Sequence, residues 1–146
     1  MSTRVSVAAK AGLLSITLNR PEAINALSLD MIEAIDRALD VADDSITAVA
    51  LDGIGERGFC AGGDVRQLWA DVSAADLDAP RRYFHAEYAL NARIAEFPKL
   101  IVAFMHGATM GGGVGLAGHS GLRIVGESSK VAMPETKIGF TPDVGG

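Results

Sequence analysis

The stretch "LIVAFMHGATMGGGVGLAGHS", residues 100–120, decides the fold class of this chain. Residues 100–107 form a short apolar run that ends in glycine, and such a run predicts a buried β-strand. Residues 111–120 begin with three consecutive glycines, which predict a tightly packed helix after a glycine turn. Seven of the 17 glycines lie between Gly107 and Gly121, a density typical of backbone that closely approaches another element or a ligand.

Strand and helix signals alternate on both sides of this stretch. Ser28 is a suitable N-cap for one predicted helix, and Pro80 suits the first turn of another. The predicted strands are 13–21, 46–53, 122–127 and 130–135, and the predicted helices are 28–44, 64–72 and 80–97. This alternation predicts an α/β fold with parallel pairing, but it fits both a spiral of strand–strand–helix units and a doubly wound sheet.

The composition is that of a single globular domain over residues 1–146. Of its residues, 49% are hydrophobic and 21% are charged, which is enough apolar material for a core. The net charge is −5 without a basic cluster, so neither nucleic acid nor an anionic membrane is an expected partner. One cysteine, Cys60, fits a reducing compartment, and no signal peptide or membrane span is recognised, so we predict a cytoplasmic protein.

The three glycines at 111–113 provide backbone amides at the start of a predicted helix. The first amides of a helix have no partner within it and lie at the positive end of its dipole, so an anionic oxygen could bind there. Close packing of a strand on a helix explains the same turn equally well. The turn matches neither the GxGxxG dinucleotide pattern nor a phosphate loop, which disfavours phosphate binding.

A second glycine turn lies in "GFCAGGD", residues 58–64, where Ala61, Gly62 and Gly63 expose backbone amides. Because each turn lies between a predicted strand and a predicted helix, the two turns could aim their amides at one point. Two convergent N–H donors form an oxyanion hole, which stabilises negative charge on a carbonyl oxygen. Cys60 is interpreted as buried filler and not as a nucleophile, because no histidine lies near it in the sequence.

Glu87 lies within the apolar arc of the helix predicted at 80–97. A carboxylate that faces a core costs free energy unless it is paired or lines a cavity. We therefore predict a cavity position for Glu87, and a salt bridge to an arginine is the alternative.

Two further carboxylates, Glu135 and Asp143, each follow a proline in "MPETKIGFTPDVGG", residues 133–146. Proline restrains the chain, and the other neighbours of both acids are mostly apolar. Carboxylates in apolar surroundings have raised pKa values and suit acid/base or nucleophilic catalysis. Acids on a surface loop explain the pattern nearly as well. His106 and His119 are isolated histidines, and we assign neither a role.

Four segments together resemble the crotonase (enoyl-CoA hydratase/isomerase) superfamily. In chain order they are "LNRPEAINALS", "GFCAGGD", "HGATMGGGVGLAGH" and "MPETKIGFTPDVGG". The last two segments, with the "EY.LN" pattern of the helix before them, are most similar to the 3-hydroxyisobutyryl-CoA hydrolase branch. The resemblance covers essentially the whole chain and implies a spiral of strand–strand–helix units. It also implies a helical C-terminal region that this chain lacks, so that Phe140 and Val144 are expected to be exposed.

The resemblance implies roles for particular residues of this chain. The family's oxyanion-hole amides correspond to Ala61 and Gly112, its catalytic acids to Glu135 and Asp143, and its substrate-binding positions to Glu87, Gly111 and Gly113. Hydratases of the family carry a second glutamate in the glycine-rich helix. This chain has Gly115 at that position, which favours thioester hydrolysis over hydration unless Asp143 takes the place of the missing glutamate.

The expected activity is therefore release of CoA from 3-hydroxyisobutyryl-CoA, a step of valine breakdown. No metal and no separate cofactor are implied, because CoA is part of the substrate. An acyl-CoA thioester is the expected partner, and a homo-oligomer would fit the family. Two alternatives remain open at this point: an enoyl-CoA hydratase or isomerase, and a catalytically silent acyl-CoA-binding module.

Overall fold

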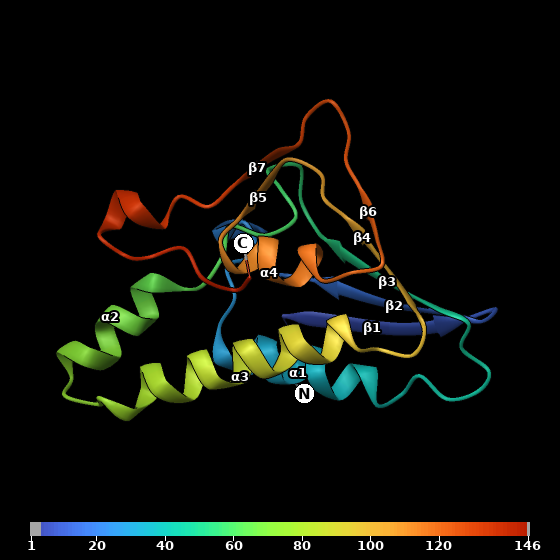
Figure 1. Cartoon of the computed structure of the whole chain (residues 1–146), viewed down its shortest axis with the longest axis horizontal. Helices are drawn as coiled ribbons and strands as arrows, with labels where there is room; N and C mark the ends of the chain where they lie inside the picture. Colours follow the sequence, from blue (N-terminus) through green and yellow to red (C-terminus); the bar gives the residue numbers. More distant parts are fainter. Residues whose placement is uncertain (1–3, 146) are drawn as a thin grey trace.

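The computed structural model describes residues 4–145, and both predicted kinds of element are present (Figure 1). The strands are β1 Val5–Lys10, β2 Leu13–Leu18, β3 Ala48–Gly53, β4 Leu100–Phe104, β5 Ala108–Met110, β6 Leu122–Ile124 and β7 Lys130–Ala132. The helices are α1 Leu29–Leu39, α2 Val65–Ser73, α3 Asp78–Ala95 and α4 Gly112–Gly118, with the 3-10 turns η1 Pro21–Ala23 and η2 Glu135–Ile138. Every predicted element has a counterpart, whereas β1 and β5 were not predicted. None of the helices in the described part of the chain is long and apolar enough to cross a membrane.

The main sheet has the strand order β1-β2-β3-β4-β6. β1 and β2 are antiparallel, and all other neighbouring pairs in this sheet are parallel. Parallel neighbours need crossover connections, which α1 supplies between β2 and β3 and the pair α2–α3 supplies between β3 and β4. β5 leaves this sheet and pairs in parallel with β7 in a second, two-stranded sheet. The chain thus winds in strand–strand–helix units, which confirms the predicted spiral.

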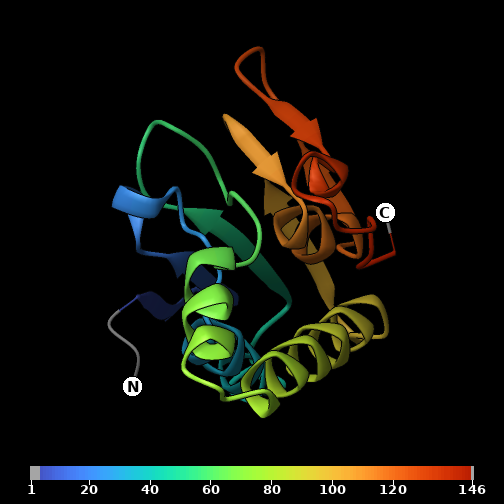
Figure 2. The same ribbon diagram turned by 90° about the vertical axis from the view of Figure 1, so that its left-hand side faces the viewer.

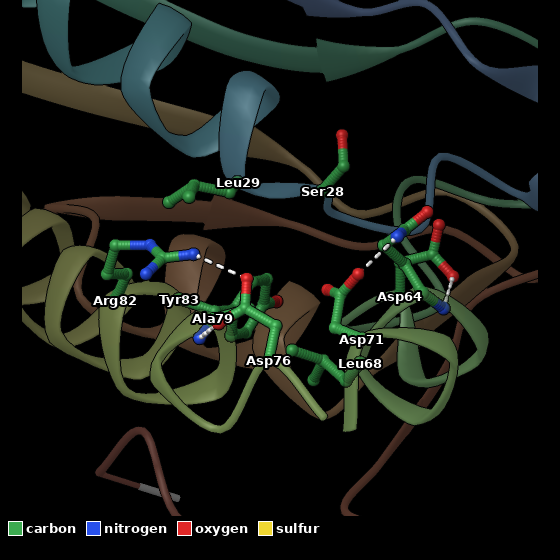
Figure 3. Close-up of a pocket in the computed structure, with 10 residues that line it drawn as sticks. Ser28, Leu29, Asp64, Leu68, Asp71, Asp76, Ala79, Arg82 and Tyr83 are labelled. Atoms are coloured by element: carbon green, nitrogen blue, oxygen red, sulfur yellow. Dashed lines mark hydrogen bonds and ion pairs between the residues drawn. The ribbon is translucent and has the colours of Figure 1, made fainter. Parts of the chain in front are cut away.

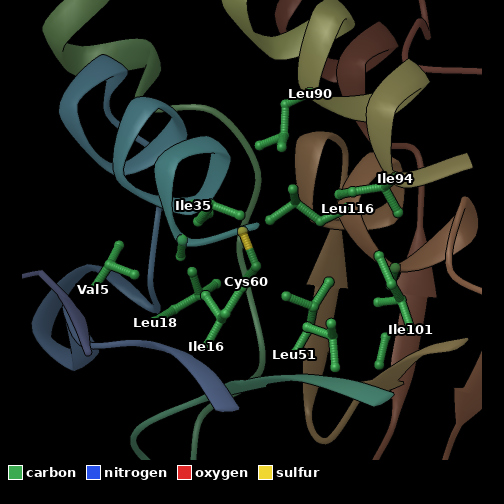
Figure 4. Packing of buried hydrophobic residues seen from close by; sticks show 14 of the residues in the cluster. Val5, Ile16, Leu18, Ile35, Leu51, Cys60, Leu90, Ile94, Ile101 and Leu116 are labelled. Atoms are coloured by element: carbon green, nitrogen blue, oxygen red, sulfur yellow. The ribbon is translucent and has the colours of Figure 1, made fainter. Parts of the chain in front are cut away.

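The core lies between the main sheet and the helices α1, α3 and α4 (Figure 4). Leu14, Ile16 and Leu18 of β2 alternate along the strand and are all buried, as the two-residue period of a strand requires. Cys60 is fully buried in the same cluster, and this burial raises the pKa of its thiol to about 12. The predicted burial of Cys60 in the core is thus confirmed, and a thiol that stays protonated is a poor nucleophile.

The residues around Cys60 run beside β5 and bring the two glycine turns together. The Cys60 amide donates to the Ala108 carbonyl at 3.1 Å, and the Met110 amide donates to the Cys60 carbonyl at 2.9 Å. The turn at 61–63 and the turn at 111–113 therefore both follow one short parallel ladder. Because the two strands leave this ladder in the same direction, the two turns lie next to each other.

Candidate active site

A cavity of about 600 Å³ lies where the two glycine turns meet. Helices α2 and α3 line one part of it, and residues 134–143 line another. Figure 1 shows this C-terminal segment (red) near α2 (green), and Figure 2 views the molecule from that side. The charged side chains that line the cavity are Glu87, Glu135, Lys137 and Asp143. The structure thus brings the three predicted acids to one place.

Among the glycines that line the cavity, two have backbone amides without a hydrogen-bond partner in residues 4–145. Gly112 is the first residue of α4, and its amide donates to no acceptor among residues 4–145. The Gly63 amide is likewise unpaired in this part of the chain. A Cβ atom on Gly112 would lie 3.4 Å from Gly63 N, so the two residues are in direct contact. Two unpaired N–H donors in such proximity can hold one negatively charged oxygen.

The Ala61 amide, which the family resemblance implies as an oxyanion donor, is already occupied. It donates to the Ile24 carbonyl at 2.8 Å, so it is not available to a ligand and this prediction is wrong. The same turn also pairs with Leu27, which forms 2.8 Å backbone hydrogen bonds with both neighbours of Gly63. Backbone groups alternate in direction along an extended chain, so the amide of Gly63 points away from Leu27.

The other two glycines of the turn at 111–113 differ in their exposure to the cavity. Gly111 lines the cavity, but its amide donates to the Ala132 carbonyl at 3.1 Å and only its missing side chain matters for access. Gly113 faces the protein interior, where a Cβ atom would lie 2.5 Å from the Cys60 carbonyl oxygen. Gly113 is not among the residues that line the cavity, and its missing side chain lets α4 pack on the ladder. Its predicted contact with the substrate stays a prediction.

Glu87 lies on the buried face of α3 with 4% of its surface exposed, and it lines the cavity as predicted. Its Oε1 atom is 3.4 Å from the Tyr83 hydroxyl and directly beside Gly112, where any Cβ atom would collide with it. None of the ion pairs within residues 4–145 involves Glu87, so the salt-bridge alternative does not hold. Burial, followed by the charge of Asp143, raises the pKa of Glu87 to about 7. Such a carboxyl group can give or take a proton near neutral pH.

Glu135 is the first residue of η2, and its side chain reaches into the cavity with 8% of the residue exposed. Its Oε1 atom lies 2.7 Å from the position that a Cβ atom of Gly111 would occupy, so the carboxylate rests against the glycine turn. Its Oε2 atom is buried and has no partner within the described residues. A buried polar atom normally has a hydrogen-bond partner, so this oxygen is placed to interact with a molecule from outside the chain.

Asp143 lines the cavity from the C-terminal segment and is half-buried. Its Oδ2 atom accepts a hydrogen bond of 2.5 Å from the hydroxyl of Tyr88. The sequence analysis assigned no role to Tyr88, which follows Glu87 directly on α3. Tyr88 is part of the "EY.LN" pattern that resembles the hydrolase branch, but that pattern did not show that its hydroxyl group reaches Asp143.

Gly115 allows Val144 to pack directly against α4. A Cβ atom on Gly115 would lie 2.8 Å from the Val144 Cβ atom and 2.9 Å from Nδ2 of Asn91. Val144 is consequently buried, so the prediction that it is exposed is wrong. Phe140 remains 42% exposed as predicted, although its ring stacks on that of Phe84 with centroids 5.6 Å apart.

A smaller hollow of about 170 Å³ shares the Tyr83 side chain with the main cavity (Figure 3). Two of its acids are paired: Asp76 accepts from Arg82 at 3.0 Å, and Asp71 accepts from Gln67 at 2.7 Å. Over residues 4–145, no cluster of histidine, cysteine and acidic side chains is arranged to hold a metal ion. The main cavity, with its unpaired amides and unpaired carboxylate oxygen, is therefore the candidate site.

Comparisons with known proteins agree with this fold. A family model described as enoyl-CoA hydratase/isomerase matches residues 13–146. The mitochondrial 3-hydroxyisobutyryl-CoA hydrolase of Danio rerio is 49% identical over 139 residues, which cover 94% of this chain and 36% of that protein. The small ribosomal subunit protein mS47 of Neurospora crassa is 46% identical over 138 residues, which cover 91% of this chain and 27% of that protein. The chain thus spans about a third of the length of the curated relatives it matches.

A solved structure matches nearly the whole chain. The crystal structure of a carnitinyl-CoA dehydratase from Mycobacterium thermoresistibile superposes with a TM-score of 0.94 and 46% sequence identity. The match covers 99% of this chain and 43% of that one. These similar proteins carry names with different activities, so the choice among activities depends on the residues of the site.

The names of the relatives overturn the prediction of a cytoplasmic protein. The hydrolases of Danio rerio, Xenopus tropicalis and Homo sapiens are all named as mitochondrial. The prediction rested on a single cysteine and on the lack of a recognised signal peptide. Neither feature distinguishes the cytosol from the interior of a mitochondrion, because both compartments keep thiols reduced.

Proposed function

Because the chain belongs to the enoyl-CoA hydratase/isomerase (crotonase) family, we propose that it forms the core of an acyl-CoA thioester hydrolase. The observation that carries this proposal is the buried, unpaired Oε2 atom of Glu135 in a cavity with two unpaired backbone amides. The relatives named 3-hydroxyisobutyryl-CoA hydrolase supply the proposed substrate. As in those relatives by name, the protein would then act in mitochondria.

The amides of Gly63 and Gly112 act in the first step of the reaction. They donate to the thioester carbonyl oxygen and stabilise the negative charge that develops on it. Glu135 attacks the carbonyl carbon, the C–S bond breaks with its electron pair on sulfur, and an anhydride forms between the acyl group and Glu135. Water then adds to the anhydride, releases the carboxylic acid and restores Glu135. As a general base, Glu135 would instead take a proton from water and direct it at the same carbon.

Glu87 and Asp143 complete the proton balance. With its pKa raised to about 7, a substantial fraction of Glu87 is protonated near neutral pH and can give its proton to the departing CoA sulfur. The acid that is formed loses its proton, which restores Glu87, so one water is consumed and one thiol is released. Asp143 accepts a hydrogen bond from the 3-hydroxyl group of the substrate and thereby orients it.

The packing at Gly115 argues against hydration of a double bond. A hydratase of this family carries a second glutamate there, whereas in this chain the space is filled by Val144 and Asn91. Without that second acid, Glu135 lacks the partner with which a glutamate pair adds water. The unpaired oxygen of Glu135 then favours attack on a carbonyl carbon.

The second candidate is a catalytically silent acyl-CoA-binding module within an assembly. The observation that favours it is the 46% identity to a protein named as a ribosomal subunit, mS47. Such a module would bind acyl-CoA through the same amides and release no thiol.

One experiment separates these functions. The protein is supplied with 3-hydroxyisobutyryl-CoA, and free thiol is followed in the wild type, in Glu135→Gln and in Glu56→Gln, an exposed acid outside the cavity that serves as the matched control. We expect Glu135→Gln to lose at least about 10²-fold in rate, in line with the loss of a catalytic group, and the control to match the wild type. Normal thiol release by Glu135→Gln would refute the role of this residue. Hydration of crotonyl-CoA without thiol release would show a hydratase, and binding without either reaction would show the silent module.

A further inference from the structure

Asp143 lies in a segment that has no regular secondary structure. Residues 140–143 are irregular, and Val144 starts a turn with φ of 47°. A left-handed conformation is a rare and strained state for a β-branched residue, and it persists only when surrounding contacts hold it. The position of Asp143 in the cavity therefore depends on the contacts that hold this segment in place.

The first grip comes from α4. The Val144 side chain is buried against Gly115, whose Cβ atom, if present, would lie 2.8 Å from that of Val144. The Val144 carbonyl accepts a hydrogen bond of 2.8 Å from Nε2 of His119, the residue that follows α4. Because a carbonyl oxygen only accepts, this imidazole carries a proton on Nε2.

The second grip comes from α3. The Tyr88 hydroxyl donates to Asp143 Oδ2 at 2.5 Å, although 44% of Tyr88 is exposed. A tyrosine that is this exposed contributes little to a core, and its hydrogen bond connects α3 directly to the C-terminal segment. One turn earlier on the same helix, Phe84 stacks on Phe140 at 5.6 Å. The two helices thus hold the segment on both sides of Asp143.

We propose that Tyr88 and His119 are positioning residues that hold Asp143 at the cavity wall near Glu87. Gly115 contributes to the same positioning, because only a residue without a side chain leaves room for Val144. The inference rests on the proposed function insofar as Asp143 serves hydrolysis, but the positioning itself can be measured without turnover.

The groups that face Glu87 make this positioning measurable. They are Tyr83 from its own helix, Cys60 directly before the turn at 61–63, and Glu135 and Asp143 from the C-terminal segment. Asp143 raises the pKa of Glu87 through its negative charge, and the Tyr83 hydrogen bond lowers it. The two tyrosines of α3 therefore shift the pKa of Glu87 in opposite directions: Tyr83 lowers it directly, and Tyr88 raises it by holding Asp143 nearby.

The test compares Tyr88→Phe with Tyr83→Phe. Each variant removes one tyrosine hydroxyl group from α3. The titration of the Glu87 side-chain carboxyl is followed by ¹³C NMR in each protein. If Tyr88 holds Asp143, its loss lets the carboxylate move into solvent, and the pKa of Glu87 falls toward its ordinary value. Tyr83→Phe removes a donor to the ionised carboxylate, so there the pKa of Glu87 rises.

His119 supplies a second, independent arm of the test. His119→Ala should lower the pKa of Glu87 as Tyr88→Phe does, whereas His119→Gln keeps an N–H donor and should restore the wild-type titration. In the hydrolysis assay, Tyr88→Phe should reduce kcat by about tenfold or more, because a displaced orienting group costs rate.

An unchanged Glu87 titration in both Tyr88→Phe and His119→Ala would overturn the proposal. Shifts of the same sign in Tyr88→Phe and Tyr83→Phe would also overturn it, because they would report general loosening of α3. If the wild type releases no thiol but the titrations shift with opposite sign, the proposed function fails and the positioning stands.

Discussion

The buried carboxyl of Glu87 makes a quantitative prediction for stability. The pKa of this group rises from 4.5 to about 7 in the folded chain, chiefly through burial. A raised carboxyl pKa stabilises the fold below the ordinary value, and this contribution is lost as pH rises through the folded value. At roughly 1.4 kcal/mol per pKa unit, Glu87 alone should lower the free energy of unfolding by about 3 kcal/mol between pH 4.5 and pH 8.

The Glu87→Gln variant isolates this contribution, because glutamine has similar shape and never ionises. We expect the variant to match the wild type near pH 4.5 and to become more stable than it by up to about 3 kcal/mol above pH 7. Urea unfolding of both proteins at pH values from 4.5 to 8.5 gives the difference in the free energy of unfolding, in which the other titrating groups cancel. Glu96→Gln, at an exposed glutamate just after α3, is the matched control and should show no such divergence. A constant difference between Glu87→Gln and the wild type over this range would refute the reasoning.

Two substitutions test the backbone around the site. Gly115→Glu should not create hydratase activity, measured by the ultraviolet absorbance of crotonyl-CoA, and should destabilise the fold by about 1–3 kcal/mol, because its Cβ atom would lie 2.8 Å from that of Val144. Asn25→Ala should lower the free energy of unfolding by at least about 2 kcal/mol in urea, because the fully buried Asn25 amide donates to the Phe59 carbonyl at 3.0 Å and accepts from the Arg20 amide at 2.8 Å. Hydration by the first variant, or wild-type stability of the second, would contradict these assignments.

The sequence predicted the elements whose side chains show a clear period. The apolar spacing of the helix predicted at 28–44 corresponds to α1, although the helix ends at Leu39, before the acidic run that follows. β1 escaped prediction because five of its six residues are exposed, so its side chains lack the buried alternation of an inner strand. β5 has three residues and could not be separated from the glycine-rich sequence around it.

The acids of the site could be predicted, but the choice of backbone donor could not. Glu87 was found because a helical period places a side chain on a known face. The availability of an amide depends instead on which neighbour the backbone pairs with, and Leu27 and Ile24 lie more than 30 residues before the turn they pair with. That pairing occupies the Ala61 amide and leaves the Gly63 amide without a partner in the described part of the chain, and no local sequence pattern indicates it. The Tyr88 contact with Asp143, which spans 55 positions, escaped for the same reason.

The ladder between Cys60 and β5 has a consequence for how this scaffold can change over generations. The groups proposed to activate a carbonyl here are the peptide N–H groups of Gly63 and Gly112, and every residue except proline supplies such a group. Replacing side chains can therefore change or abolish the reaction of a bound thioester, while the backbone amides still hold its carbonyl oxygen. We therefore expect related proteins to change their activity through the acidic side chains and the residues that position them. The backbone amides at the two glycine turns should be retained longest.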